Sequence, residues 1–377
     1  MDNIARIDIK IPDVTATFVG TKEIDGFANV LNDFPEAKEV RILTYSNIGG
    51  KSNKAKRLRE LSPETNVHIV IALPGLYQKG DNVYSVGDIA TKLNKIKDLF
   101  DLKLYAGKNV EISVCFKNHA KLIGTENILY IGSANYSDFS HKNYEAGMII
   151  RDKEVIRKIY DEFFDEIIAV RYYGDGYDDI RLELLAVMDA LIDLDLYIDE
   201  FVEFFDERAE NIENIQGLNT ILFSMIKDLV KKLESYEENL IEDVLNEIID
   251  IQDMLSTVMI NIDNAFDSDY DKGIEYFANY YENSHMEKMG VYCSDAWIDE
   301  NTPYIPLYEE PLEDQISYIE DYWKDKLQNK PEVIETKNIV RDSYKKVKEL
   351  ISIFQKSSFE LFELELIKVG TDKNALK

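Results

Sequence analysis

Short apolar runs alternate with segments of helical periodicity over the first 151 residues. Runs rich in β-branched residues predict six strands, at 40–45, 67–73, 110–116, 122–123, 128–131 and 146–150. A period near 3.6 predicts helices at about 23–34, 51–61 and 86–100. Strands that alternate with helices within one segment indicate an α/β domain with a mixed sheet flanked by helices.

From Asp152 onward the pattern is helical. A turn-rich stretch at 173–177 separates one amphipathic helix from helices that continue to about residue 260, and two more fit at 313–328 and 332–368. Between them, 261–312 is irregular. The spacing of 4 and 3 between Leu222, Ile226, Leu229, Leu233, Tyr236 and Leu240 predicts a seam, read most simply as one within a helical bundle. We therefore expect an α/β domain over 1–170 and an all-α region over 171–377.

Charge is distributed unevenly between these two regions. Residues 1–151 hold 20 Lys and Arg and 18 Asp and Glu, which leaves 23 and 54 for 152–377 out of totals of 43 and 72. The first part is near +2 and the second near −31. Because a strongly acidic region repels a polyanion, any nucleic acid must be held by the first domain. The acidic helices are expected to be regulatory or to bind a partner.

The sequence also bears on location. No apolar run approaches the roughly 20 residues needed to span a bilayer, so we expect no membrane insertion. Met1-Asp2-Asn3 does not open a signal-peptide pattern. The two cysteines, Cys115 and Cys293, are far apart, which favours a reducing compartment over a disulfide framework. We expect a cytoplasmic protein.

Candidate chemistry gathers in one stretch, His119-Ala120-Lys121 followed by Gly132-Ser133-Ala134-Asn135. If His119 and Lys121 lie on a strand, alternation puts both side chains on one face. The next strand then brings Ser133 and Asn135 beside them. Cleavage of a phosphodiester needs such a set: a cation and hydrogen-bond donors stabilise charge on the non-bridging oxygens, while an imidazole attacks or transfers a proton.

These residues resemble the HKD motif of the phospholipase D superfamily, His-x-Lys-x4-Asp followed by Gly-Ser-x-Asn, and the likeness extends over about residues 25–168. The resemblance implies a phospholipase D-like α/β fold. It implies that His119 is a nucleophile forming a phosphohistidine, that Lys121 and Asn135 bind phosphate and that Ser133 helps place it. It also implies that Glu145 is the carboxylate supporting the histidine. Two positions depart from the family: Glu126 stands in place of the Asp, and the gap to Gly132 is one residue shorter.

Members of this family combine two motifs in one active site, whereas this chain has one. None of the other histidines, His68, His141 and His285, lies in a comparable arrangement, and His68 is expected to be a structural residue of a strand. A single motif implies a homodimer with a shared site. Single-motif members are mostly nucleases, so we expect a nucleic-acid substrate. Lys117, Lys51, Lys54 and Arg57 are candidate phosphate-backbone contacts, although the cluster at 51–59 also fits a solvated helix face.

No carboxylate cluster with metal-ligand spacing lies near the motif, so we expect a metal-independent reaction without a cofactor. Related nucleases often accompany ATPases or helicases in bacterial restriction or phage-defence systems, and the resemblance implies such a partner. Three alternatives stay open: a phospholipase or phosphatidyltransferase acting on lipids, a decayed copy kept for binding, and a non-catalytic assembly protein that retains the fold.

Overall fold

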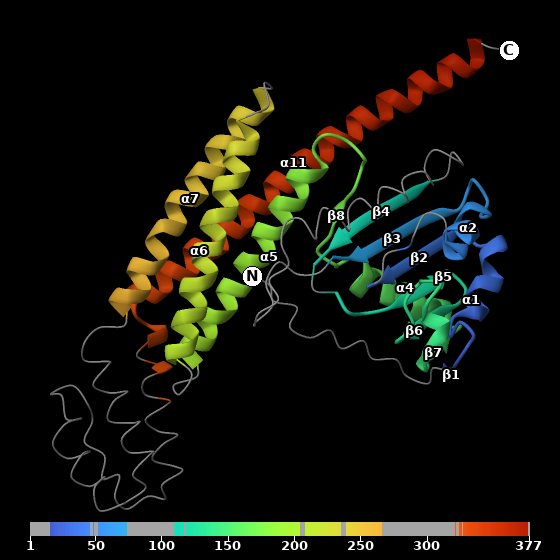
Figure 1. Cartoon of the computed structure of the whole chain (residues 1–377), viewed down its shortest axis with the longest axis horizontal. Helices are drawn as coiled ribbons and strands as arrows, with labels where there is room; N and C mark the ends of the chain where they lie inside the picture. The colour runs from blue at the N-terminus through green and yellow to red at the C-terminus, as the bar shows by residue number, and fades with distance from the viewer. Residues whose placement is uncertain are drawn as a thin grey trace, which may run out of the picture. The chain divides into compact units, whose positions relative to one another are not determined.

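The computed structural model describes residues 16–45, 48, 52–73, 109–116, 118–203, 208–234, 239–265, 321, 324–325 and 327–375 (Figure 1). The chain divides into two compact units. One comprises Met1–Ala186 with Lys348–Lys377, and the other comprises Val187–Val347. The helices expected at 86–100 and over most of 313–328 lie outside the described residues. The division into domains at 170 stays a prediction about independent folding.

The first unit contains an eight-stranded mixed sheet, which confirms the predicted fold class. Its strands follow the order β1-β7-β6-β5-β2-β3-β4-β8. Strands β2, β3 and β4 are parallel, and the remaining pairs are antiparallel. The strands are β1 (Ala16–Thr21), β2 (Glu39–Thr44), β3 (Asn66–Ala72), β4 (Val110–Cys115), β5 (Leu122–Thr125), β6 (Leu129–Gly132), β7 (Glu145–Ile150) and β8 (Val170–Arg171).

Two layers cover the sheet. On one face, α4 (Lys153–Ile159) and the π-helical turn η3 (Tyr160–Phe164) bury apolar side chains of the central strands, among them Leu43, Val70 and Leu122. On the other face, Phe27 packs between the rings of Tyr130 and Tyr136, at 5.9 and 5.7 Å between centroids. Short helices complete the unit: α1 (Ala28–Asp33), η1 (Phe34–Glu36), α2 (Asn53–Arg59) and η2 (Ser140–Lys142). Burial on both faces explains the consecutive apolar residues Ile42–Leu43 of β2 and Ile69–Ala72 of β3.

Four long helices are described beyond the sheet: α5 (Asp178–Glu203), α6 (Arg208–Leu233), α7 (Asn239–Ala265) and α11 (Pro331–Ala375). They confirm the all-α character of the C-terminal region. In the second unit α6 packs on α7, and Leu222, Ile226, Leu229 and Leu233 of the predicted seam are buried there. The seam is therefore intramolecular where the structure describes it. In the first unit, buried Arg181 pairs with Asp178 and donates to the Phe354 carbonyl oxygen at 3.3 Å. No helix in the described ranges has the length and apolar character to cross a membrane.

Candidate active site

One end of the sheet brings the predicted site residues together. His119 and Lys121 directly precede β5, Ser133 and Asn135 follow β6, and Glu145 begins β7. The antiparallel register pairs Leu43 with Leu122, Leu122 with Ile131, and Gly132 with Gly147. The end of β2, the start of β5, the end of β6 and the start of β7 are therefore adjacent. Tyr45, the residue after β2, joins them there, and the sequence pattern did not indicate it.

The backbone around His119 differs from the expectation that His119 and Lys121 lie on a strand. Strand β5 begins only at Leu122. The Asn118 side chain accepts from the Ala120 N–H at 3.0 Å and donates to the Ala120 carbonyl at 3.1 Å. These backbone groups would otherwise form hydrogen bonds with a neighbouring strand. The two side chains consequently have different surroundings: His119 is exposed, whereas Lys121 is 6% exposed.

The His119 imidazole lies against Tyr45, with 5.5 Å between ring centroids and 58° between ring planes. In the described part of the chain, neither ring nitrogen has a hydrogen-bond partner. The carboxylate of Glu145 does not contact the ring there, although the family pattern assigns that supporting role to Glu145. An exposed imidazole with unoccupied nitrogens can approach a phosphorus atom or a leaving oxygen.

Lys121 places a positive charge within the protein next to the backbone of His119. Its ammonium donates to the His119 carbonyl oxygen and lies 5.6 Å from the centroid of the Tyr45 ring. Burial lowers the pKa of Lys121, and the nearby negative charge of Glu145 opposes that shift. Because a partly desolvated cation interacts strongly with an anion, Lys121 is suited to stabilising a phosphate.

Ser133 and Asn135 are held by bonds to neighbouring strands. The Ser133 hydroxyl donates to Glu145 and accepts from the Ala146 N–H at 3.0 Å. The Asn135 Oδ1 accepts from the Tyr45 N–H at 3.1 Å and from the Thr44 hydroxyl at 3.4 Å. Within the described ranges the Asn135 Nδ2 has no partner, so its two N–H groups are available donors. The orientation of this amide is therefore fixed by its oxygen while its nitrogen can bind a ligand.

Glu126, which replaces the aspartate of the family motif, is a structural residue. It lies at the far end of β5 from His119, where its carboxylate accepts from the N–H of Lys38 at 3.1 and 3.2 Å and from that of Glu39 at 3.1 Å. These bonds attach the turn after β5 to the start of β2. The Glu126 carboxylate thus supports the sheet.

The candidate basic contacts are arranged differently from the expectation. Lys51 and Lys117 lie outside the described residues. Lys54 is 6% exposed because its helix face turns inward, and its ammonium pairs with Asp25 over the Phe27 ring. Arg57 is exposed and lies 3.8 Å from Glu60. Of these four, Arg57 alone is described with a side chain that can reach a phosphate backbone.

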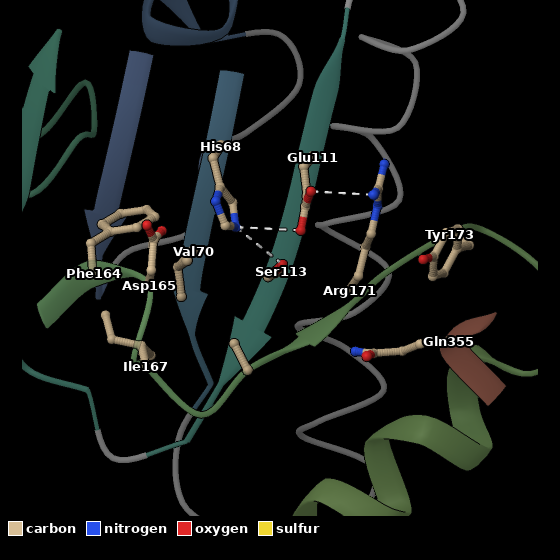
Figure 2. A pocket seen from close by; sticks show the side chains of 11 residues that line it. His68, Val70, Glu111, Ser113, Phe164, Asp165, Ile167, Arg171, Tyr173 and Gln355 are labelled. Carbon is tan, nitrogen blue, oxygen red and sulfur yellow. Dashed lines mark hydrogen bonds and ion pairs between the residues drawn. The ribbon is translucent and has the colours of Figure 1, made fainter. Parts of the chain in front are cut away.

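A separate polar cavity of about 350 Å³ opens near the β3, β4 and β8 edge of the sheet (Figure 2). His68 lines it, so this histidine is more than the strand-core residue that the sequence suggested. Its Nε2 lies 3.5 Å from the Ser113 hydroxyl and 3.5 Å from Glu111, and burial lowers its pKa. A Ser–His–acid relay needs the serine and the acid on opposite ring nitrogens, so this cluster is not one. The lining residues are His68, Val70, Glu111, Ser113, Phe164, Asp165, Ile167, Ala169, Arg171, Tyr173 and Gln355.

No protein-family model and no curated protein matches this chain. Among solved structures, it is similar to NucT from Helicobacter pylori, with 17% identity and a TM-score of 0.30 over 42% of this chain and 100% of that one. It is also similar to Nuc from Salmonella typhimurium, a phospholipase D family member, with 19% identity and a TM-score of 0.27 over 42% of this chain and 99% of that one. Polyphosphate kinase from Porphyromonas gingivalis matches at 13% identity and a TM-score of 0.28, over 50% of this chain and 31% of that one.

Proposed function

We propose that this chain provides one half of a phosphodiesterase active site and acts as a metal-independent nuclease on DNA or RNA. One observation carries the proposal: His119, Lys121, Ser133, Asn135 and Glu145 lie at one end of the sheet, where the exposed His119 ring and the buried Lys121 ammonium both lie against Tyr45. The same five positions match the motif pattern of the phospholipase D superfamily.

The proposed reaction has two steps. A His119 nitrogen attacks the phosphorus, a P–N bond forms, and the P–O bond to the leaving oxygen breaks while a second imidazole protonates that oxygen. The second imidazole then takes a proton from water, the water oxygen attacks the phosphorus, and the P–N bond breaks. Lys121 and the Asn135 amide stabilise the charge on the non-bridging oxygens in both steps. The products are a phosphomonoester and an alcohol.

The second imidazole is proposed to be His119 of another copy of the chain. An exposed apolar row lies next to the site and supports this arrangement. Phe18, Met148 and Ile131 pair across β1, β7 and β6, and Ile131 lies near the end of β6, two residues before Ser133. Exposed apolar residues that adjoin an incomplete site favour burial against a second copy.

The His119→Ala variant tests the proposed nucleophile. Hydrolysis of a simple phosphodiester, bis(p-nitrophenyl) phosphate, should fall by several orders of magnitude while the circular dichroism spectrum is unchanged. His141→Ala is the matched control because His141 lies outside the motif, and it should retain turnover. Acid-quenched wild-type protein should carry a phosphate adduct on His119 by mass spectrometry. Substantial hydrolysis by the His119→Ala variant would refute the assignment.

The substrate class is tested with labelled DNA, RNA and a choline lipid in parallel. Cleavage of the lipid alone would favour the phospholipase alternative, and binding without cleavage of any of them would favour the non-catalytic one. For the acidic helices we propose a regulatory role or the docking of an ATPase or helicase partner, for which the charge of about −31 over 152–377 is the support.

A further inference from the structure

Two exposed aromatic rings lie within the segment that links Asn135 to Glu145. Phe139 is 70% exposed and Tyr144 is 81% exposed. Groups of exposed apolar side chains can mark interaction sites. Each ring has a lysine ammonium over its face: Lys142 is 5.0 Å from the centroid of Phe139, and Lys22 is 4.5 Å from that of Tyr144. The pairing of aromatic rings with lysines is the composition of surfaces that hold single-stranded nucleic acid.

The segment that carries these rings is held by other residues. The Asp138 carboxylate accepts from the N–H groups of Asn53 at 2.8 Å and Lys54 at 3.1 Å, at the start of α2. The buried Tyr136 hydroxyl donates to the Lys54 carbonyl oxygen at 3.1 Å. The Glu23 N–H donates to the His141 carbonyl oxygen at 2.5 Å. Neither the Phe139 ring nor the Tyr144 ring takes part in these hydrogen bonds, so both rings project from a segment that other residues hold in place.

Tyr144 lies beside the candidate active site. Tyr144 precedes Glu145, whose carboxylate accepts from the Ser133 hydroxyl. Thr21 pairs with Glu145 across β1 and β7, so Lys22 is the next residue opposite Tyr144, and its ammonium donates to the Tyr144 hydroxyl at 3.2 Å. A strand bound on the Tyr144 ring would therefore run towards the end of the sheet that carries the candidate site.

We infer that Phe139 and Tyr144 are stacking platforms for the bases of single-stranded nucleic acid, with Lys22 and Lys142 beside its phosphates. This inference deepens the proposed nuclease function and rests on it for the location of the cut. Rings take the π-face of any base, so sequence preference should be weak and DNA and RNA should both bind. In a duplex the base faces are already stacked on one another, so they are not available to stack on the Phe139 and Tyr144 rings. The platform thus selects single strands.

The test uses the full chain with His119→Ala, which permits binding without cleavage. Fluorescence anisotropy with a labelled mixed-sequence DNA or RNA of about 15 nucleotides gives the Kd. Adding Tyr144→Leu or Phe139→Leu, which keep apolar bulk but remove the ring, should raise the Kd roughly fivefold to a hundredfold. Tyr144→Phe keeps the ring and should stay within about twofold. A duplex and an abasic strand of equal length should show no dependence on either ring.

The outcomes separate the platform from the proposed chemistry. In chains with His119 intact, hydrolysis of bis(p-nitrophenyl) phosphate by the Leu variants reports on the chemistry alone, and we expect the loss of strand affinity to exceed any loss of this hydrolysis. Unchanged strand affinity in both Leu variants would overturn the platform and leave the phosphodiesterase standing. Equal weakening of duplex and single strand would also overturn it, as would a lowered dimer fraction in light scattering that accounts for the whole loss. Ring-dependent binding by a chain that hydrolyses no diester would instead refute the proposed function alone.

Discussion

Substituting Gly132 with alanine should damage the candidate site through steric overlap. A Cβ at this position would lie 2.3 Å from the Tyr130 hydroxyl oxygen and 2.4 Å from the Ala146 carbonyl oxygen. Optimal separations between non-bonded heavy atoms are about 3.5–4.0 Å, so one or both oxygens must move by roughly 1 Å. The Tyr130 side chain is buried and its hydroxyl donates to the Ala146 oxygen, so neither group can shift independently.

The displaced carbonyl also holds Ser133. The Ser133 N–H donates to the Ala146 oxygen at 2.9 Å, and β6 pairs with β7 through Gly132 and Gly147. Overpacking of this kind costs about 1–3 kcal/mol, and a weakened hydrogen bond adds about 0.5–1.5 kcal/mol. We therefore expect a loss of about 2–4 kcal/mol in the free energy of unfolding. A displacement of the catalytic groups by about 1 Å should lower turnover roughly a hundredfold.

Gly20→Ala is the matched control. Gly20 lies opposite Ala146 on the neighbouring strand β1, and a Cβ there would meet its closest neighbour, a Phe18 ring carbon, at 3.5 Å, an ordinary contact. This variant should change stability by no more than about 0.5 kcal/mol. Urea unfolding followed by circular dichroism and turnover of a simple diester measure both effects. If Gly132→Ala is as stable and as active as Gly20→Ala, the steric argument is wrong.

Three further predictions concern metal and pH. Hydrolysis should continue in excess EDTA, because Lys121 can supply the positive charge to the phosphate; complete loss restored by magnesium would contradict this. Burial lowers the pKa of Lys121 and Glu145 raises it, so the rate should fall at alkaline pH earlier in the Glu145→Gln variant than in wild type, and an unmoved pH profile would exclude Lys121 as the titrating group. Burial lowers the pKa of His68 from 6.5, so the unfolded chain binds more protons just below that pH and stability should drop as pH falls through it. His68→Gln should lose less stability in urea unfolding over the same interval; equal losses would show that His68 does not cause the drop.

The sequence by itself predicted the mixed sheet, the helical C-terminal region and the pairing of the strand after His119 with the strand before Ser133. Alternation and apolar runs report whether a residue is buried, and consecutive strands usually pair, so β5 and β6 could be placed side by side. The sequence did not predict the edge strands β1 and β8, because a strand is recognised by its buried apolar residues. Strand β1 is largely exposed, and β8 has two residues. Neither leaves a clear pattern of burial.

Only the tertiary structure decided which ends of distant strands meet. Tyr45 reaches His119 because β2 pairs with β5, a contact between segments more than 70 residues apart in sequence. Lys54 looked like a phosphate ligand in the sequence, yet its helix turns it towards Asp25. The cavity at His68 and the pairing of Lys22 with Tyr144 likewise join separate segments. Local composition reports the burial and conformation of each segment, whereas partners across the sheet depend on long-range packing that no local pattern encodes.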